Sequence, residues 1–556
     1  MLTEEYPTIP DYPPEENPPR RWVKRLLVGA AVLVPVLLIG AFLAAAFGLS
    51  GARMGRDSAA LASVETETFG GEVASVKATD PKGKEIPIAV HDGKLVPEKK
   101  LHPGETIQLE VVVKRPSAIA WVAGETNTLR MTMRTPKAKP VTRWISVPKK
   151  SGVPKVHFSQ PVSDVSWGQA GELVHHHFKH PQRVLSLGEQ ATAGSVIVAA
   201  APRPWEHVGK FKTVTWFPAS GSPVLAASPA AGSEISPSTP FELTFSKSVK
   251  KVLGGKDPVL EPEVPGKWVQ VDRHTIRFVP SGFGAPMATD LEAKLPEKVE
   301  VVQADGSTAS TNKVVWHVPA GNPLRLQQML AQLGYMPNSW KAGKGEEVAL
   351  TPEAQVRAAT EPPQGSFEWR YHHTPGSLKA LWNPGEQEVI TQGALMAFQS
   401  EQGLETDGVA GPEVWEALMK AEIAGEKRPS GPGGGYTYVW VSETLPEQVN
   451  VWHDGKVVVS GAANTGIPGA ETALGTFPVY LRYEETTMSG ENPDGSHYSD
   501  PGIKWVSYFN GGDALHAFDR ASYGSPQSLG CVEMPLEEAE AVYPYTPLGT
   551  LVHIES

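Results

Sequence analysis

The chain has 556 residues, of which 40% are hydrophobic and 20% are charged, and its formal net charge is −11 at pH 7. This length is enough for several domains and excludes a single hydrophobic core. The 54 glycines and 51 prolines favour many β-strands joined by turns. The acidic balance argues against nucleic acid as a partner, because a phosphate-binding surface needs a net basic face.

The N-terminal part predicts a tail followed by a membrane span. Residues 1–25 are rich in proline and glutamate and end in arginines and a lysine, which predicts a disordered cytoplasmic tail. No charge occurs over residues 26–49, and at about 1.5 Å per residue a helix of this length crosses a hydrocarbon core of about 30 Å. The preceding cations predict a single-pass helix with the N-terminus in the cytoplasm. The alternative is a signal peptide cleaved near Ala44–Ala46.

Residues 66–222 predict one or two β-rich modules. Apolar runs such as Ile107–Val113 and Ser195–Val198 are separated by glycine and proline turns. The region also contains four closely spaced histidines, His175, His176, His177 and His180. No carboxylate or cysteine accompanies them at ligand spacing, so we interpret them as part of a surface strand or loop and predict no metal site.

Residues 223–319 predict an antiparallel β-sandwich. Apolar side chains alternate in Pro240–Phe245 and in Thr275–Val279, as in strands with one buried face. This pattern resembles the immunoglobulin-like modules that often precede a catalytic domain in bacterial cell-wall enzymes. The resemblance implies a spacer that holds the catalytic part of the chain away from the membrane.

Residues 323–424 predict a small helical module. Leu326, Met329, Leu330 and Leu333 share one helical face, Gly334 follows as a stop signal, and Gly411-Pro412 opens a later helix. With Phe398-Gln399 and Asp407-Gly408, this pattern resembles the three-helix peptidoglycan-binding module. A helical linker without a ligand is the alternative.

The two halves of this module are far apart in the sequence, which predicts an insertion over residues 342–387. Its aromatic residues Trp369, Tyr371 and Trp382 are either the core of the insertion or a platform for sugar, and we favour the core. The glycine-rich residues 425–435 then predict a flexible joint.

The last segment, residues 436–556, predicts a mainly β domain. Tyr436–Val441 and Val449–Trp452 are expected strands, and Asp454-Gly455 is an expected turn. Residues 487–502 contain many Gly, Ser, Asn and Asp residues, and we predict a mobile loop that acts as a lid.

This segment holds Cys531, the single cysteine of the chain. A lone cysteine forms no internal disulfide, and an unpaired thiol outside the cytoplasm indicates chemistry. A thiol needs a base to become a good nucleophile, and His516 is the nearest candidate. Alone, the cysteine also fits a small buried apolar residue and the histidine a structural one. The histidine precedes the cysteine, whereas papain-like peptidases have the reverse order.

The residues around Cys531 predict the rest of the site. Gly530 permits a tight turn, so that the amides near Gly530 and Cys531 can hold an oxyanion. Ser528 is expected to bond within the same loop. Four further residues are candidates for substrate contacts, namely Tyr498, Tyr508, Asp519 and Arg520.

The pattern His516, then Ser528-Leu-Gly-Cys-Val-Glu-Met534, resembles the active-site motif of the L,D-transpeptidases of the YkuD fold. Upstream, Asn464–Gly466 and Thr472–Phe477 are similar to a second segment of that family. Leu529, Glu533 and Ala517 depart from its usual residues. The departure at Glu533 leaves open how a substrate carboxylate is held.

The resemblance implies that Cys531 attacks a peptidoglycan stem peptide, releases its terminal D-residue and passes the acyl group to an amine. It implies stem peptides and glycan as partners, covalent inhibition by carbapenems, and no metal or organic cofactor. The alternatives are a non-catalytic wall-binding scaffold and an L,D-carboxypeptidase that uses water as acceptor. The expected location is the cell membrane, with the catalytic domain facing the wall.

Overall fold

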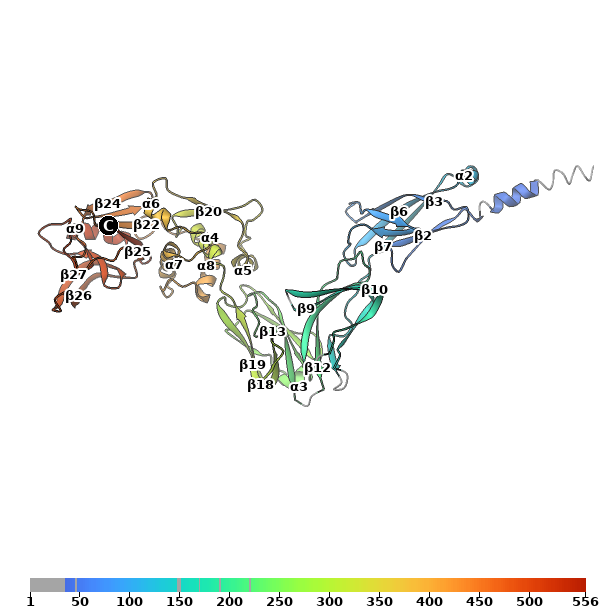
Figure 1. The fold of residues 1–556 in the computed structure, drawn as a ribbon, viewed down its shortest axis with the longest axis horizontal. Helices are drawn as coiled ribbons and strands as arrows, with labels where there is room; N and C mark the ends of the chain where they lie inside the picture. The colour runs from blue at the N-terminus through green and yellow to red at the C-terminus, as the bar shows by residue number, and fades with distance from the viewer. Residues whose placement is uncertain (1–35, 46–47, 148–151, 170, 190–191, 220–221) are drawn as a thin grey trace, which may run out of the picture. The chain divides into compact units, whose positions relative to one another are not determined.

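The structure is a computed structural model that describes residues 36–45, 48–147, 152–169, 171–189, 192–219 and 222–556. Strands dominate the described residues, and helices gather in one region before the C-terminal domain (Figure 1). The predicted class, a mainly β multidomain protein, is therefore confirmed. The chain divides into two compact units, and the second contains Thr215–Ser556.

The N-terminal predictions lie mostly outside the described residues. The tail predicted over residues 1–25 is outside them entirely, and of the predicted span the structure describes residues 36–45 and 48–49. Residues 36–45 are helical. In the described part of the chain, no helix has both the length and the apolar character needed to cross a membrane.

The first β-module contains two sheets with a shared core. One sheet has the order β1-β2-β5-β4 and the other the order β3-β6-β7. Their bounds are β1 Ala52–Gly55, β2 Ala62–Thr66, β3 Glu72–Thr79, β4 Ile88–His91, β5 Lys94–Pro97, β6 Thr106–Lys114 and β7 Thr126–Arg134, with the short helix α2 Ser117–Ala123 before β7. Leu95 of the first sheet and Ile107 and Val111 of the second are fully buried in one apolar cluster, because alternate residues of β6 face inwards.

The next sheet has the order β10-β9-β11-β12-β8. Its strands are β8 Trp144–Val147, β9 Lys155–Gln169, β10 Glu172–Ser186, β11 Gly194–Ala201 and β12 Lys212–Pro218. The four clustered histidines lie on β10 and are exposed, so the predicted surface strand is confirmed. His177 Nδ1 lies 3.0 Å from Asp164 Oδ1 on β9. The described residues include no group of three or more His, Cys, Asp or Glu side chains arranged to hold a metal ion.

Residues 224–318 form a seven-stranded sheet around one core. Its order is β15-β18-β13-β14-β17-β16, with β19 paired to β18. The elements are β13 Val224–Ala231, β14 Phe241–Phe245, α3 Val249–Leu253, β15 Val259–Glu261, β16 Gly266–Gln270, β17 Thr275–Pro280, β18 Thr289–Gln303 and β19 Thr308–Val318. The expectation of a purely antiparallel arrangement was wrong, because β13 and β18 are parallel. The long connection through β14 to β17 makes that pairing possible.

The helical module begins with α4 and ends with α8. Its elements are α4 Pro323–Leu333, β20 Asn338–Ala342, α5 Pro352–Thr360, β21 Gly365–Trp369, α6 Gly376–Ala380, α7 Val389–Gln402 and α8 Pro412–Ala424. The predicted end of α4 and start of α8 are confirmed: Gly334 caps α4 with a left-handed φ of 103°, and Pro412 is the first residue of α8. The insertion folds as the β20–β21 pair with α5 and α6. Trp382 packs against the core of the module, which agrees with the interpretation as core, whereas Tyr371 packs against Trp452 of the C-terminal domain.

The predicted flexible joint is instead tied down, because residues 425–435 are bonded to the helical module and to one another. Arg428 donates from its backbone nitrogen to Leu333 O at 2.7 Å and from Nη1 to Gly435 O at 2.6 Å. Beyond the joint, Tyr371 Oη donates to Asp454 Oδ1 at 2.5 Å. A shared apolar cluster then joins α6 and α7 to the C-terminal domain through Leu378, Ile390, Tyr438, Trp452 and Leu551. Glycine content alone indicates flexibility, but these contacts fix the segment.

The C-terminal domain consists of two sheets and a short helix. The first sheet has the order β24-β23-β22-β30-β25 and the second the order β26-β27-β28-β29. The bounds are β22 Thr437–Ser442, β23 Gln448–His453, β24 Lys456–Ala462, β25 Gly475–Pro478, β26 Leu481–Glu491, β27 His497–Asn510, β28 Asp513–Ala517, β29 Val532–Met534, α9 Leu536–Val542 and β30 Leu551–Glu555. The core contains Val439 and Val451 of the first sheet and Leu515, Val532 and Met534 of the second.

The loop predicted over residues 487–502 is instead the end of the β26–β27 hairpin (Figure 1). Met488 pairs with Asp500 and Ser489 with Ser499, and a short turn follows in which Asn492 N donates to Ser496 O at 2.7 Å. The polar composition suggested a loop. A two-stranded ribbon with exposed faces needs few apolar residues, so the polar composition did not distinguish a hairpin from a loop.

Candidate active site

The parallel pair β28–β29 places Cys531 and His516 on one face of the second sheet. Leu515 pairs with Val532 and His516 with Glu533. Leu515 and Val532 point into the core, so the alternate residues His516 and Glu533 point to the opposite face. Cys531 directly precedes β29 and lies two residues before Glu533, so its side chain points to the same face as that of Glu533. The strand register therefore brings the predicted nucleophile and base to the same side.

Both residues line one cavity of about 290 Å³. Its lining consists of Met488, Asn492, Tyr498, Asp500, Ile503, His516, Phe518, Arg520, Gln527, Leu529, Cys531 and Glu533. The β26–β27 hairpin, the loop after β28 and the loop before β29 all contribute to this wall. Cys531 is partly exposed, so the sulfur is not sealed in the core. The cavity gives a substrate access to the face on which the two residues lie.

The imidazole of His516 is held in one tautomer by its neighbour. Its Nδ1 lies 2.9 Å from the carbonyl oxygen of Ala517. A carbonyl only accepts hydrogen bonds, so Nδ1 carries the proton and Nε2 has a free lone pair. His516 is 2% exposed, and burial lowers the pKa of its imidazole. The neutral side chain can therefore accept a proton at Nε2 near neutral pH.

The thiol of Cys531 is protonated in this environment. Burial raises its pKa to about 12, and Sγ lies 3.6 Å from Gly512 O, to which the thiol donates. The Ala514 amide, which stabilises the charged form, acts in the opposite direction but is the smaller effect. In the described part of the chain, no hydrogen bond joins Cys531 to His516. The site at rest thus has a protonated thiol and a neutral imidazole in the wall of one cavity.

The loop before Cys531 matches part of the predicted oxyanion arrangement. Gly530 has a φ of +111°, and a side chain there would meet Asp513 Oδ1 at 2.5 Å. Ser528 bonds within the loop as predicted: its Oγ donates to Cys531 O at 2.6 Å and accepts from Gly530 N at 3.2 Å. The Gly530 amide is therefore engaged and does not point freely at a substrate. The Cys531 amide has no hydrogen-bond partner among the described residues and is the available donor.

The predicted substrate contacts separate into two groups. Tyr498 and Arg520 line the cavity, and Tyr508 packs on the same small apolar cluster as Cys531. Burial is the main cause that raises the pKa of both tyrosines. Asp519 is exposed and is not part of the cavity wall. The structure thus places three of the four candidates near the sulfur.

Two segments that are far apart in the sequence are bonded together beside the site. Asn464 and Glu533 exchange two backbone hydrogen bonds, of 3.0 and 2.9 Å, and Thr465 O accepts from the amides of Gln527 and Ser528. The buried carboxylate of Glu447 accepts from Thr465 N at 2.7 Å and from Thr465 Oγ1 at 2.9 Å. Sequence analysis missed Glu447, because no local pattern connects it to the loop. It also missed Asp513, although this residue begins the strand that carries His516.

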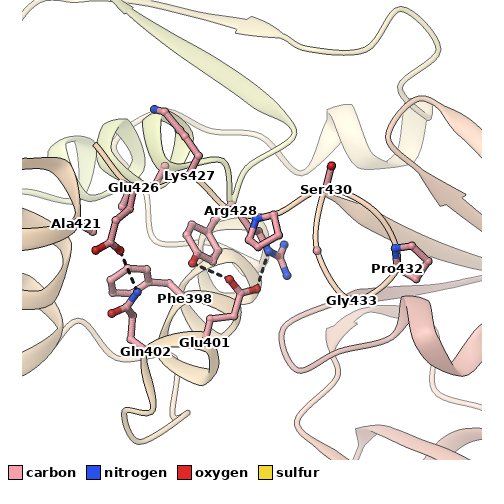
Figure 2. A pocket seen from close by; sticks show the side chains of 14 residues that line it. Phe398, Glu401, Gln402, Ala421, Glu426, Lys427, Arg428, Ser430, Pro432 and Gly433 are labelled. Atoms are coloured by element: carbon pink, nitrogen blue, oxygen red, sulfur yellow. Dashed lines mark hydrogen bonds and ion pairs between the residues drawn. The ribbon is translucent and has the colours of Figure 1, made fainter. Parts of the chain in front are cut away.

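A larger cavity of about 640 Å³ lies where the helical module meets residues 425–435 (Figure 2). Glu401 bonds both the Tyr335 hydroxyl and Arg428 Nε at 2.8 Å. Gln402 donates to Glu426 at 3.4 Å. These polar groups are already paired with one another, and the cavity contains neither Cys531 nor His516. We therefore place the candidate active site in the smaller cavity.

Residues 436–554 match the family model of the L,D-transpeptidase catalytic domain. The chain carries this catalytic domain. The match confirms the predicted function and enzyme class, a peptidoglycan L,D-transpeptidase with a cysteine nucleophile. A second model, of a putative peptidoglycan-binding domain, matches residues 384–418, which contain α7 and the first half of α8. The comparison with curated proteins gave no match.

Several solved L,D-transpeptidases are similar to this chain. The catalytic domain from E. faecium is 26% identical, covers 21% of this chain and 95% of its own, and has a TM-score of 0.20. LdtMt1 in complex with imipenem is 12% identical, and the match covers 60% of this chain and 99% of LdtMt1, with a TM-score of 0.20. L,D-transpeptidase 3 from Mycobacterium tuberculosis, with a faropenem-derived adduct, is 11% identical and covers 60% and 98%, also with a TM-score of 0.20.

In the peptidoglycan-binding region, the motif residues form a turn. Gln399 donates to Asp407 Oδ1 at 2.6 Å and to Val409 O at 3.1 Å, and accepts from Gly408 N at 2.8 Å. The same motif that carried the resemblance thus connects α7 to α8. Its glutamine and aspartate are used to hold this loop.

Proposed function

We propose that Cys531 is the nucleophile and His516 the general base of the transpeptidase reaction. The carrying observation is that the β28–β29 register directs both side chains to one face and into one cavity. As Sγ attacks the donor carbonyl, the thiol proton moves to Nε2 of His516. The bond from Nδ1 to Ala517 O holds the ring in the required tautomer.

The remaining steps of the reaction use the same two residues. The Cys531 amide donates to the oxyanion of the tetrahedral intermediate. When the C–N bond breaks, the proton on His516 passes to the departing amine of the D-residue and leaves a thioester. An acceptor amine then attacks the thioester, His516 takes its proton, the C–S bond breaks, and the proton returns to sulfur. Neither step requires a metal or an organic cofactor.

The partners and the location are part of the same proposal. We infer that peptidoglycan stem peptides and glycan bind the helical module and the cavity, and that a helix over residues 26–49 anchors the chain in the cell membrane. The module over residues 223–319 is then an immunoglobulin-like spacer between membrane and wall. The apolar run and its cationic flank support the anchor. Protease added to intact spheroplasts should digest the C-terminal domain, and its complete protection would contradict this topology.

Mass spectrometry of the full-length protein tests the chemistry. We expect a stem tetrapeptide to leave an acyl adduct on the wild type, and a carbapenem to acylate it in the same way. Both adducts should be absent from Cys531→Ala. Product analysis with and without an amine acceptor then measures transpeptidation against hydrolysis. A wild-type thiol that stays unmodified by both compounds would exclude the proposed roles.

A further inference from the structure

Glu533 and Arg520 form a charged pair in the wall of the cavity. Arg520 Nε donates to Glu533 Oε2 and Nη2 to Glu533 Oε1, both at 2.8 Å. This two-point geometry fixes both the distance and the plane of the guanidinium. Arg520 comes from the loop after β28 and Glu533 from β29, so the pair connects the two segments that carry His516 and Cys531.

The two partners differ in their access to the cavity. The side chain of Glu533 is 5% exposed, whereas that of Arg520 is 30% exposed. Arg520 is further held by a 3.0 Å bond from Nη2 to Gln527 O and by the ring of Phe518, whose centroid lies 4.5 Å from its central carbon. Its Nη1 has no partner among the described residues and is not one of the buried unpaired atoms. The guanidinium of Arg520 is therefore held in place while its Nη1 is open to a ligand.

We propose that Arg520 binds a carboxylate of the donor peptide and that Glu533 is the residue that positions it. This inference rests on the proposed function and names the contact that sets donor specificity. A guanidinium with Nε and Nη2 already engaged keeps Nη1 for a charge-assisted bond to an incoming carboxylate. Glu533 itself is too buried and too fully paired to serve as the contact. The two charges also act in opposite directions on the base, since the carboxylate of Glu533 raises the pKa of His516 and the guanidinium of Arg520 lowers it.

The carboxylate has two possible sources on a donor with a D-residue to lose. One is the terminal carboxylate of that departing residue, and the other is a carboxylate elsewhere on the stem. Both would present the same chemistry to Nη1. Donors amidated at one position or the other distinguish them.

Binding to an inactive variant tests the proposal without the chemistry. In the full-length protein with Cys531→Ala, calorimetry measures Kd for a stem tetrapeptide with free carboxylates and for its two mono-amides. We expect one amide to bind about tenfold or more weakly, which identifies the carboxylate that Arg520 holds. Adding Arg520→Gln should weaken the free acid to the level of that amide and leave the amide unchanged. Lys504→Gln, an exposed cation on β27, is the control and should change neither.

Exchange of the two charges tests the role of Glu533. The double variant Arg520→Glu/Glu533→Arg restores the pair but moves the cation to the buried position, so we expect near-wild-type melting and loss of the preference for the free acid. Glu533→Gln should weaken the free acid without changing affinity for the amide. Equal weakening of acid and amide by Arg520→Gln, or an unchanged preference in the exchanged variant, would overturn the proposal. Failure of wild-type acylation is a separate result that addresses Cys531 and His516.

Discussion

Replacement of Gly530 by alanine tests whether the turn before Cys531 sets the position of the nucleophile. Gly530 has a φ of +111°, and a Cβ there would lie 2.5 Å from Asp513 Oδ1. Backbone strain should lower the free energy of unfolding by about 1–2 kcal/mol. The overlap with Asp513 should add about 1–3 kcal/mol. The total loss of about 2–5 kcal/mol lies at or below the lower end of the roughly 5–15 kcal/mol that holds a domain folded, so the variant should still fold.

The folded variant should relieve the overlap by moving the loop. Gly530 is next to Cys531, so its displacement moves both the sulfur and the amide that we assign to the oxyanion. A shift of about 1 Å in a reacting group costs about 100-fold in rate. We therefore expect Gly530→Ala to slow acylation of Cys531 by about that factor while most of the protein remains folded.

A matched glycine separates the backbone strain from the overlap with Asp513. Gly495, in the β26–β27 turn, has a φ of +83°, and its added Cβ would meet only a flexible Glu491 side-chain atom at 3.6 Å. Gly495→Ala should show the backbone strain alone. Chemical denaturation measures stability and mass spectrometry measures the acylation rate. In Gly530→Ala/Asp513→Ala the overlap is absent, so part of both losses should return. If Gly530→Ala equals Gly495→Ala in stability and acylates at the wild-type rate, the steric argument is refuted.

Three further predictions concern the thiol, the loop and the module contact. Alkylation of Cys531 by neutral iodoacetamide should still accelerate above pH 9, because burial raises the pKa of the thiol to about 12, and a plateau near pH 8.5 would contradict this. Ser528→Ala removes the acceptor of the Gly530 amide and the donor to Cys531 O, so the acylation rate should fall by about tenfold or more with a stability loss of about 1–3 kcal/mol. Wild-type acylation by that variant would show that the bonds are dispensable. Tyr371→Phe removes the bond to Asp454 and should lower the free energy of unfolding by about 1.5–3 kcal/mol, which thermal melting measures. An unchanged melting temperature would argue against a fixed contact between the helical module and the catalytic domain.

The pH dependence of catalysis follows from the direction of the His516 shift. The imidazole must be neutral to accept the thiol proton, and burial lowers its pKa below the ordinary value of about 6.5. Acylation should therefore remain high at pH 6.5 and decline only at lower pH, as the ring becomes protonated. The pH–rate profile for acylation by a carbapenem measures this. A half-maximal rate above pH 7 would contradict the assigned environment of His516.

Local signals in the sequence were reliable where one segment decides its own structure. The stop at Gly334 and the start at Pro412 were predicted because the φ of glycine and the missing amide of proline act within one turn. Composition misled at residues 425–435 and 487–502. In both places the deciding factor was a partner elsewhere in the chain, namely Leu333 for the first and the opposite strand of a hairpin for the second.

The sequence by itself determined that one cysteine and a preceding histidine lie within a motif of transpeptidase type, since residue identity and spacing are written in the chain. Only the tertiary structure decided that the Ala517 carbonyl fixes the tautomer of His516, that Ser528 engages the Gly530 amide, and that Glu533 pairs with Arg520. These relations depend on strand register and on which face each side chain takes. Register is set by pairing between distant segments, and a shift of one residue would turn every side chain of the strand to the opposite face of the sheet.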